Sequence, residues 1–295
     1  MDRRPILVTG GSGQLASALA ASAGVPVVRV GRPDFDFERP DSIAAAWRSA
    51  APSLVVNAAA YTAVDAAETD AEAAYRANRD GPAVLARLCT EAGIPLIHIS
   101  TDYVFDGAKA TPYVESDPVA PQSVYGASKL AGETAALAGC AQAIVLRTSW
   151  VYAAAGRNFV LTMLNLAKTR DRLQVVADQF GCPTAAADLA AAILAVAMRI
   201  RAEGWQQRFG GVFHAAGDGS TTWHGLACAV FEEAARHGSR IPRVDPTTTA
   251  EYPTKAKRPA NSRLDCSKLA AVFDVRLPVW RPSLARTIDA IFATR

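Results

Sequence analysis

The sequence predicts an α/β protein with a doubly wound parallel sheet and a smaller C-terminal α/β lobe. In the first half of the chain, apolar runs of strand length alternate with amphipathic segments of helix length, and a glycine-rich turn follows the first run. Strands that alternate with helices build parallel sheets of the Rossmann type. The alternation loosens after Trp150, which predicts the second lobe.

The first half should contain five strands and four helices. The strands are expected at Ile6–Thr9, Val25–Val30, Leu54–Asn57, Leu96–Ser100 and Ala143–Arg147. The helices are expected near Gln14–Ala23, Ser42–Ser49, Asp70–Ala92 and Ser123–Leu137.

The second half is less regular. Strands are expected at Leu173–Ala177 and Val212–Ala215, and helices at Asn158–Thr169, Asp188–Arg201, Ser267–Phe273 and Pro282–Phe292. The stretch Pro242–Arg263 is rich in Pro, Thr and Lys, and it is expected to be irregular. We expect a Rossmann domain at 1–150 with a returning segment near 173–205. Residues 151–295 should form most of the second lobe, with the chain crossing between lobes.

Composition excludes several classes of protein. The chain has 295 residues, 50% of them hydrophobic, which is ample for a packed core. A net charge of +3 without a Lys/Arg-rich block argues against nucleic-acid binding. No apolar run reaches the length of a membrane span, and the N-terminus lacks the pattern of a signal peptide. The five scattered cysteines fit reduced thiols in a cytoplasmic protein, and the four histidines show no metal-ligand spacing.

The glycine-rich turn Thr9–Ala16 predicts a nucleotide site. Gly10 permits a tight turn, and Gly13 lets the backbone approach a pyrophosphate at the start of a helix that Gln14 and Leu15 open. A purely structural turn would also contain glycine. The position between a strand and a helix favours a dinucleotide cofactor.

The end of the second strand bears on the choice of cofactor. Folds that prefer NAD usually place an acidic residue here, and this chain has Arg32 instead. Arg32 can meet a 2′-phosphate, which favours NADPH, although NADH stays possible and a solvated surface arginine would look the same. Asp36 and Phe37, just beyond, are assigned to the adenosine end of the cofactor site.

Three polar side chains predict a carbonyl-reducing site. Tyr125 and Lys129 are four residues apart in an expected helix and therefore share one face. A nearby ammonium should lower the tyrosine pKa, which makes the phenol a proton donor near neutral pH. Thr101 ends the fourth strand, where open α/β sheets bind ligands, and its hydroxyl can donate to the same carbonyl oxygen. A strand-end cap and a half-buried helix residue are the structural alternatives.

Several sequence blocks resemble the extended short-chain dehydrogenase/reductases, and within them the dTDP-4-dehydrorhamnose reductase family. The resemblance runs nearly end to end, and its blocks are Gly10–Leu15, Asn57–Asp65, Ser100–Gly107, Tyr125–Glu133, Leu146–Tyr152, Asp178–Thr184 and Lys257–Ser262. It implies that NADPH reduces the C4 ketone of dTDP-4-dehydro-β-L-rhamnose to dTDP-β-L-rhamnose, the last step of dTDP-rhamnose biosynthesis. Residues 1–150 would then bind NADP, and 151–295 mainly the substrate.

The resemblance also assigns contacts in the two binding sites. Lys129 would hold the nicotinamide ribose, and Trp150 would stack on the sugar ring, although core packing is the alternative for an indole. The remaining cofactor contacts are Asn57, Ala58, Ala59, Ala60 and Tyr61, together with Tyr125. The remaining substrate contacts are Val64, Thr101, Asp102, Tyr103, Asn158, Arg258 and Asn261, the last three near the nucleotide diphosphate. For Lys257 and Arg258, a solvated basic loop is the alternative.

Two rival functions stay open. Another nucleotide-sugar reductase or epimerase of the superfamily would share most of these blocks. A dehydratase is disfavoured, because related dehydratases carry a second acid after Thr101-Asp102, where this chain has Tyr103. A non-catalytic NADP-binding regulatory subunit is the other rival, and the intact Thr101, Tyr125 and Lys129 argue against it.

One departure from the family concerns assembly. Some relatives dimerise around Mg²⁺ that glutamates hold, and the matching positions here are Ala18 and Ala187. Alanine offers no ligand atom, so the sequence predicts no metal site. A monomer, or a dimer that Mg²⁺ does not bridge, is expected.

Overall fold

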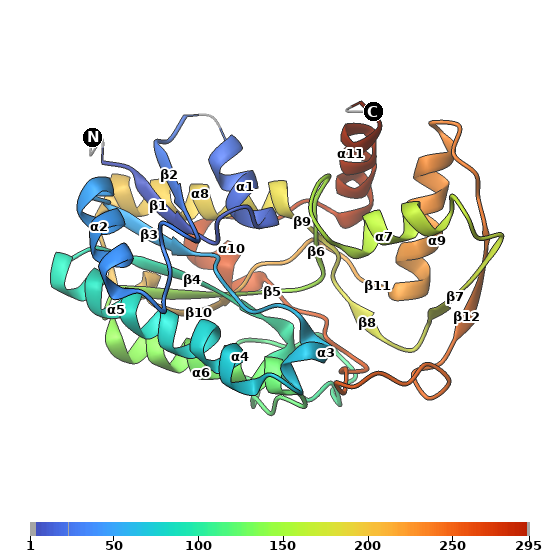
Figure 1. The fold of residues 1–295 in the computed structure, drawn as a ribbon, viewed down its shortest axis with the longest axis horizontal. Helices are drawn as coiled ribbons and strands as arrows, with labels where there is room; N and C mark the ends of the chain where they lie inside the picture. Colours follow the sequence, from blue (N-terminus) through green and yellow to red (C-terminus); the bar gives the residue numbers. More distant parts are fainter. Residues whose placement is uncertain (1–3, 23, 294–295) are drawn as a thin grey trace.

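A six-stranded parallel sheet forms the core of the larger lobe (Figure 1). The computed structural model describes residues 4–22 and 24–293. The strand order is β10-β5-β4-β3-β1-β2, and every neighbouring pair is parallel. The strands are β1 Ile6–Thr9, β2 Val27–Val30, β3 Leu54–Asn57, β4 Leu96–Thr101, β5 Ala143–Thr148 and β10 Gly211–His214. The predicted Rossmann-type fold is confirmed.

Helices cover both faces of this sheet, which explains why most of its strands are largely apolar. Ile6 and Val8 of β1 pack in one hydrophobic cluster with α1 Gln14–Ala21, α8 Ala186–Glu203 and α10 Ser267–Phe273. Leu7, between them, points to the opposite cluster. The helices on that side are α2 Pro40–Ala50, α5 Gly81–Ala92 and α6 Val124–Gly139. The predicted helix end at Ala23 lies outside the described residues.

The long helix expected at Asp70–Ala92 is divided into three parts. α4 Ala71–Tyr75 and α5 are joined by η1 Arg76–Asp80, a turn of π-helix. Asn78 in this turn is buried, exchanges hydrogen bonds with the backbone of Tyr61 and donates to Ser128 Oγ at 2.9 Å. The wider turn thus presents a polar side chain to the loop after β3, and such turns are frequent at functional sites.

The smaller lobe has its own core. α7 Phe159–Leu166, α9 Trp223–Ala235 and α11 Trp280–Ala293 pack against the parallel pair β7 Arg172–Val176 and β12 Arg243–Thr247. The expectation that Pro242–Arg263 is irregular is therefore wrong for its first residues. Pro246 within the strand, Pro242 just before it and few apolar residues hide this strand in the sequence, and pairing with β7 along its whole length helps to stabilise it.

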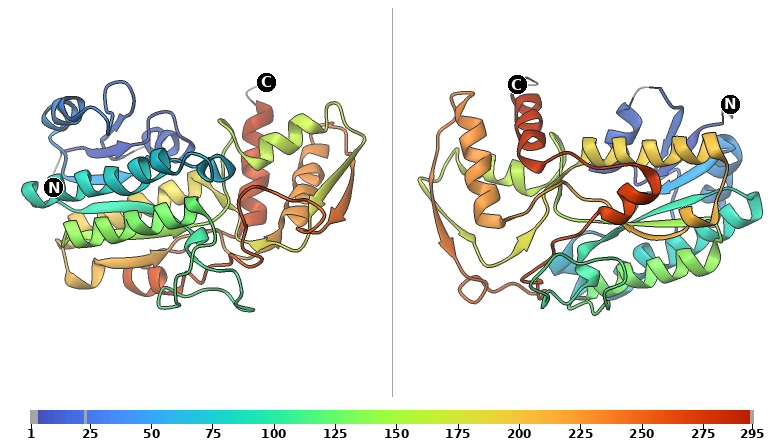
Figure 2. Two further views of the ribbon diagram at one scale, coloured as in Figure 1. Left: turned by 60° about the horizontal axis from the view of Figure 1, so that its bottom comes forward. Right: turned by 180° about the vertical axis from the view of Figure 1, so that it is seen from behind.

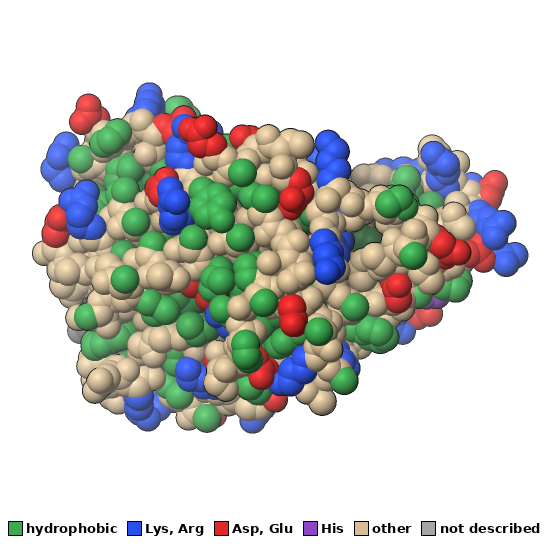
Figure 3. Space-filling view, turned by 90° about the horizontal axis from the view of Figure 1, so that it is seen from below, with side chains coloured by type: hydrophobic (Ala, Val, Ile, Leu, Met, Phe, Trp, Pro, Cys, Tyr) green, Lys and Arg blue, Asp and Glu red, His purple; other side chains and the backbone are tan. Residues whose placement is uncertain are grey.

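The chain crosses between the lobes several times (Figure 2). α8 and β10 return to the larger lobe, where α8 packs against α1 and β10 extends the sheet beside β5. β7, also within the predicted returning segment, pairs instead with β12. Short two-residue pairs lie where the lobes meet: β6 Val151–Tyr152 with β9 Thr184–Ala185, and β8 Phe180–Gly181 with β11 Thr221–Thr222. Seen from below, a broad lobe joins a narrower one (Figure 3). How the lobes divide cofactor from substrate stays a prediction.

Among residues 4–22 and 24–293, no helix combines the length and apolar character that crossing a membrane requires.

Candidate active site

The glycine loop lies where three strand ends converge. Gly10 has a φ of +111°, and a Cβ on it would come within 2.9 Å of the Ala58 oxygen after β3. A Cβ on Gly31, after β2, would come within 2.4 Å of the Gly11 Cα. The loop can pack this closely only because these positions lack side chains. The loop therefore lies at the carboxyl edge of the sheet. Here β2 and β3 lie on opposite sides of β1, and folds of this type bind ligands at such a point.

The start of α1 is suited to an anion. Gly13 is its N-cap, and no side chain caps the first turn that Gln14 and Leu15 begin. The backbone N–H groups of this turn and the helix dipole together attract a phosphate. Gln14 Oε1 accepts a hydrogen bond from Asn158 Nδ2 at 2.8 Å, which joins the loop to the smaller lobe. The residues present thus fit the pyrophosphate of a dinucleotide.

The segment after β2 holds the residues predicted at the adenosine end. Arg32 is exposed beyond the strand. The Asp36 backbone donates to Ser42 Oγ at 3.0 Å, which fastens this segment to α2. The Phe37 ring packs against Gly81 at the start of α5, where a Cβ would come within 2.6 Å of it. Phe37 is therefore already in contact with protein, and its part in cofactor binding stays a prediction.

The end of β3 is fixed by a buried polar network. Asn57 Oδ1 accepts from Thr9 Oγ1 at 2.6 Å and from the Ala59 backbone at 3.2 Å, and its amide nitrogen lies 3.0 Å from His98 Nδ1. These bonds join β1, β3 and β4, so the Asn57 side chain positions the loop that follows. Ala58, Ala59 and Ala60 are half-buried and keep this stretch of backbone accessible.

The predicted catalytic residues come together at the carboxyl end of β4. Thr101 ends this strand, and Tyr125 lies in the first turn of α6, which Ser123 caps by accepting from the Gly126 backbone at 3.2 Å. The Thr101 hydroxyl lies near enough to the Tyr125 phenol to lower its pKa. Lys129 follows one turn later, is buried, and donates from Nζ to the Ile99 carbonyl at 2.6 Å.

Burial controls the proton affinities of this pair. It is the main reason that the pKa of Tyr125 is raised to about 12, while nearby Thr101 acts to lower this pKa and the charge of Asp102 acts to raise it. Burial also lowers the pKa of Lys129 to about 8, against the attraction of Glu133. The expected lowering of the tyrosine pKa by Lys129 is therefore wrong for the chain alone, because desolvation outweighs any effect of the ammonium. Tyr125 is consequently protonated at neutral pH.

The Asp102 carboxylate contacts the hydroxyls of Thr101 and Ser149. It is buried and accepts from Thr101 Oγ1 and Ser149 Oγ, each at 2.9 Å. Burial raises its pKa to about 6, while hydroxyl donors, including Ser262, hold the pKa down. The Tyr103 backbone donates to Thr101 Oγ1 at 3.2 Å. The Thr101 hydroxyl is thus oriented by its own neighbours, and Ser149 belongs to a set that sequence reasoning missed.

A buried ion pair fixes α6 against the sheet. Arg147 of β5 donates to Glu133 of α6 from Nε at 2.9 Å and from Nη2 at 2.7 Å, and both side chains are almost fully buried. Ser100, next to Thr101, also donates to Glu133. Because one carboxylate holds both β4 and β5, the pair positions Tyr125 relative to Thr101. In the sequence, the signal for this ion pair was that Glu133 and Arg147 are charged residues within largely apolar segments.

Most of the predicted substrate contacts already bind protein. The Asn261 amide donates to the Lys109 and Thr111 carbonyls at 2.6 and 2.9 Å. Arg258 makes two bonds to Asp65, at 3.2 and 2.7 Å, and so ties the loop after β12 to α3 Val64–Ala67. The part of each in substrate binding stays a prediction.

Two pairs of aromatic residues include predicted substrate contacts. The Tyr103 and Tyr125 rings meet edge to face at 5.9 Å. Trp150, after β5, stacks on Trp223 of α9, a residue that the sequence did not single out.

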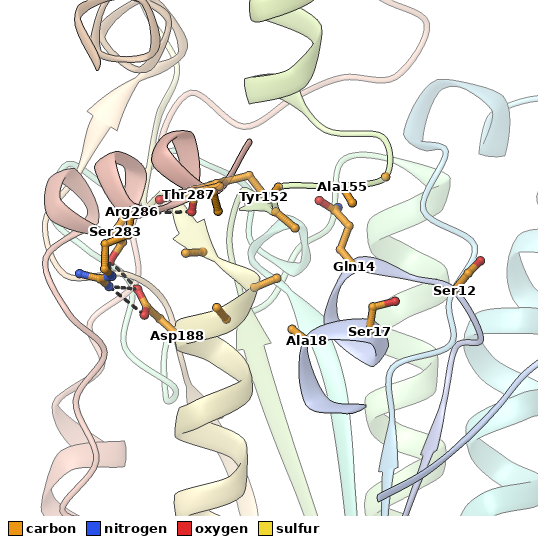
Figure 4. A pocket seen from close by; sticks show the side chains of 17 residues that line it. Ser12, Gln14, Ser17, Ala18, Tyr152, Ala155, Asp188, Ser283, Arg286 and Thr287 are labelled. Carbon is orange, nitrogen blue, oxygen red and sulfur yellow. Dashed lines mark hydrogen bonds and ion pairs between the residues drawn. The ribbon is translucent and has the colours of Figure 1, made fainter. Parts of the chain in front are cut away.

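A cavity of about 320 Å³ lies between the glycine loop, from which Ser12 and Gln14 line it, and α8 and α11, and neither Thr101 nor Tyr125 is among its lining residues (Figure 4). Ala18 and Ala187 both line it. Asp188 at its edge is held by Arg286, at 3.0 and 3.1 Å, and by Ser283. Within the part of the chain that the structure describes, no group of three His, Cys, Asp or Glu side chains is arranged to hold a metal ion.

The model of the RmlD substrate binding domain family matches residues 3–292. A dTDP-4-dehydrorhamnose reductase of Sinorhizobium fredii is 46% identical, with 97% of each chain covered. The crystal structure of a dTDP-4-dehydrorhamnose reductase from Clostridium acetobutylicum has a TM-score of 0.88 at 36% identity, covering 97% of this chain and 99% of that one. The Bacillus anthracis enzyme, solved in complex with NADP, has a TM-score of 0.89 at 31% identity, covering 98% and 100%. The chain is therefore an oxidoreductase that belongs to the dTDP-4-dehydrorhamnose reductase family.

Proposed function

We propose that the protein uses NADPH to reduce the C4 ketone of dTDP-4-dehydro-β-L-rhamnose to dTDP-β-L-rhamnose. One observation carries the assignment: Tyr125, in the first turn of α6, and Thr101, at the end of β4, lie together at the edge of the sheet where the glycine loop also lies, and Thr101 is near enough to the phenol to lower its pKa. Relatives that carry the reductase name support the choice of sugar.

The residues of this chain would supply the proton and hold the substrate. NADPH, when bound at the glycine loop, supplies the hydride. As the C4 oxygen gains negative charge, Tyr125 would donate its proton to it, and a phenol with a pKa of about 12 gives up that proton readily to an alkoxide. Solvent then reprotonates the phenolate. Lys129, held by the Ile99 carbonyl, would turn its remaining N–H donors toward the nicotinamide ribose.

NADPH is the proposed cofactor, and NADH stays possible. Arg32 is exposed at the end of β2, where a guanidinium can meet a 2′-phosphate, and the related Bacillus anthracis enzyme was solved with NADP. The ratio of kcat/KM for the two cofactors, in wild type and Arg32→Ala, tests this: the variant should lose most of the preference for NADPH.

The substrate would lie between the lobes. Trp150 would contact the sugar, Val64 and Tyr103 would border it, and Arg258 would reach the diphosphate from the loop after β12. A guanidinium suits bidentate contacts to phosphate oxygens, which supports this placement.

We infer that the protein is a monomer or a dimer without a bridging Mg²⁺. Alanines occupy both matching positions, and the carboxylate of Asp188, next to Ala187 in the chain, is engaged by Arg286. Light scattering with and without EDTA should give one particle size, and dissociation by EDTA would refute the inference. A cytoplasmic location fits the five free cysteines.

The activity is tested by incubating the pure protein with NADPH and freshly generated dTDP-4-dehydrorhamnose. We expect stoichiometric oxidation of NADPH and formation of dTDP-rhamnose. Turnover of the sugar without net loss of NADPH would indicate an epimerase. Tight NADPH binding without any turnover would indicate a regulatory subunit.

A further inference from the structure

Both faces of the Trp150 ring are covered in the free protein. Trp223 stacks on one face with ring centroids 3.5 Å apart and planes inclined by 8°. A Cβ on Gly181 would lie 2.3 Å from Cε2, 2.5 Å from Nε1 and 2.6 Å from Cζ2 of Trp150. Such similar distances mean that Gly181 approaches over the ring. Because Trp223 fills the first face, Gly181 lies against the second.

Gly181 and Trp223, which cover the two faces of Trp150, differ in how easily they can move. Gly181 is backbone in β8, which pairs with β11 in a short antiparallel ladder. Trp223 is a half-buried side chain at the start of α9, and its ring can leave by rotation about its side-chain bonds. Its other neighbour is Phe159, with ring centroids 4.7 Å apart and planes inclined by 45°. Only the Trp223 face can therefore be vacated without moving a strand.

Trp150 lies where a ligand of this sheet would bind. It follows β5, whose last residue Thr148 pairs with Thr101 of β4. Its φ of +47° is unusual for a residue other than glycine. Conformations of this kind persist where the surrounding structure imposes them, and they cluster at ligand sites.

We propose that Trp223 gates the sugar subsite. Its ring covers the face of Trp150 opposite Gly181 in the free enzyme, and it leaves when a ligand with an apolar face replaces it. The proposal rests on the proposed function, and the ligand is the 6-deoxysugar of the substrate. The C–H groups and methyl of such a sugar can stack on an indole much as another ring does. Each binding event therefore breaks one stack of two indole rings and forms a contact between the sugar C–H groups and the Trp150 ring. Trp223 thereby lowers the affinity of the subsite without touching the reacting atoms.

Circular dichroism tests the displacement in the unmodified protein. Two stacked indoles couple their excited states and give an exciton couplet in the far ultraviolet. Saturating dTDP-rhamnose, added with NADP⁺, should abolish the couplet, whereas NADP⁺ alone should preserve it. A couplet that persists while calorimetry shows the sugar nucleotide bound would overturn the gate and leave the proposed function intact. No binding of dTDP-rhamnose at all would reject the proposed function and the gate together.

A variant series gives a second, kinetic readout. Trp223→Ala should lower the KM for the ketosugar roughly threefold to tenfold, because the competing ring is gone, with kcat within about twofold of wild type. The KM of Trp223→Phe should lie between the values of wild type and Trp223→Ala. Trp205→Phe is the matched control: this indole contacts Phe209 on the far side of the larger lobe, so KM and couplet should not change. A raised KM in Trp223→Ala with an unchanged melting temperature would overturn the gate, since it would mean that Trp223 contributes to sugar binding.

Discussion

The two lobes hold their functional side chains in different ways. In the larger lobe, Thr101 and Tyr125 stand on a strand end and a helix start that the buried Glu133–Arg147 pair locks together. In the smaller lobe, Trp223 and Arg258 contact the larger lobe through a ring stack and a partly exposed ion pair. The first kind of contact keeps a proton donor in place, and the second kind can be exchanged for a ligand. We therefore expect the chemistry to depend on the buried contacts of the larger lobe and substrate recognition to depend on the contacts between lobes.

The largest effect should come from removing the proposed proton donor. Tyr125→Phe keeps the ring and its contact with Tyr103 but removes the hydroxyl, so we expect kcat to fall about 10²- to 10⁴-fold with NADPH affinity nearly unchanged. Steady-state kinetics and cofactor titration measure both. Tyr252→Phe, at an exposed tyrosine, is the control and should behave as wild type. Equal kcat in the two variants would remove Tyr125 from the chemistry.

Breaking the buried ion pair should cost the larger lobe much of its stability. Glu133→Gln leaves the Arg147 charge without its carboxylate, and we expect a loss of about 3–5 kcal/mol in the free energy of unfolding. Urea unfolding measures it. Glu91→Gln removes the partner of exposed Arg87 and should change stability by about 0.5 kcal/mol or less. Similar losses at both sites would mean that the buried pair does not brace the sheet.

Asp102 should make stability depend on pH. Burial raises its pKa from 3.8 to about 6, so between these values the native state keeps a proton that the unfolded chain has lost. Its contribution is therefore fully present below about pH 4 and is lost as the pH rises through about 6. Relative to Asp102→Asn, the wild type should lose about 3 kcal/mol of stability over this window. Urea unfolding across the window checks the sign, and a gain for the wild type would contradict it.

The smallest effect should come from the loop of the smaller lobe. Arg258→Gln removes a guanidinium proposed to reach the diphosphate, and we expect the KM for the sugar nucleotide to rise roughly tenfold with kcat little changed. Lys257→Gln is matched in charge and position, but Lys257 is exposed and donates to the Gln122 side chain, so its KM should change less than about twofold. Equal changes in both variants would indicate a general effect of positive charge.

Sequence was sufficient for the larger lobe because its signals are local. Strands β1, β3, β4 and β5 are continuous apolar runs, which burial on both faces requires. β12 could not be read in this way, because Pro246 and its polar neighbours form a strand only against β7. The π-helical turn at Arg76–Asp80 was also hidden, since its cause is a contact between Asn78 and residues far away in the chain.

The same limit applies to the site. Tyr125 and Lys129 could be found because their spacing on one helix is local, and Thr101 because it ends a strand. Ser149 beneath Asp102 and Trp223 on Trp150 are separated in sequence by 47 and 73 residues, so only the fold brings them together. The tyrosine pKa also depends on burial, which spacing does not reveal, and this explains why its shift was predicted in the wrong direction.

The most direct test of the central claim follows the hydride itself. NADPH that carries deuterium at the transferable C4 position, incubated with dTDP-4-dehydrorhamnose and the wild-type protein, should give dTDP-rhamnose with one deuterium at C4 of the sugar. Nuclear magnetic resonance of the product locates it. Product formed without deuterium at C4, or no consumption of NADPH with the ketosugar bound, would contradict the account.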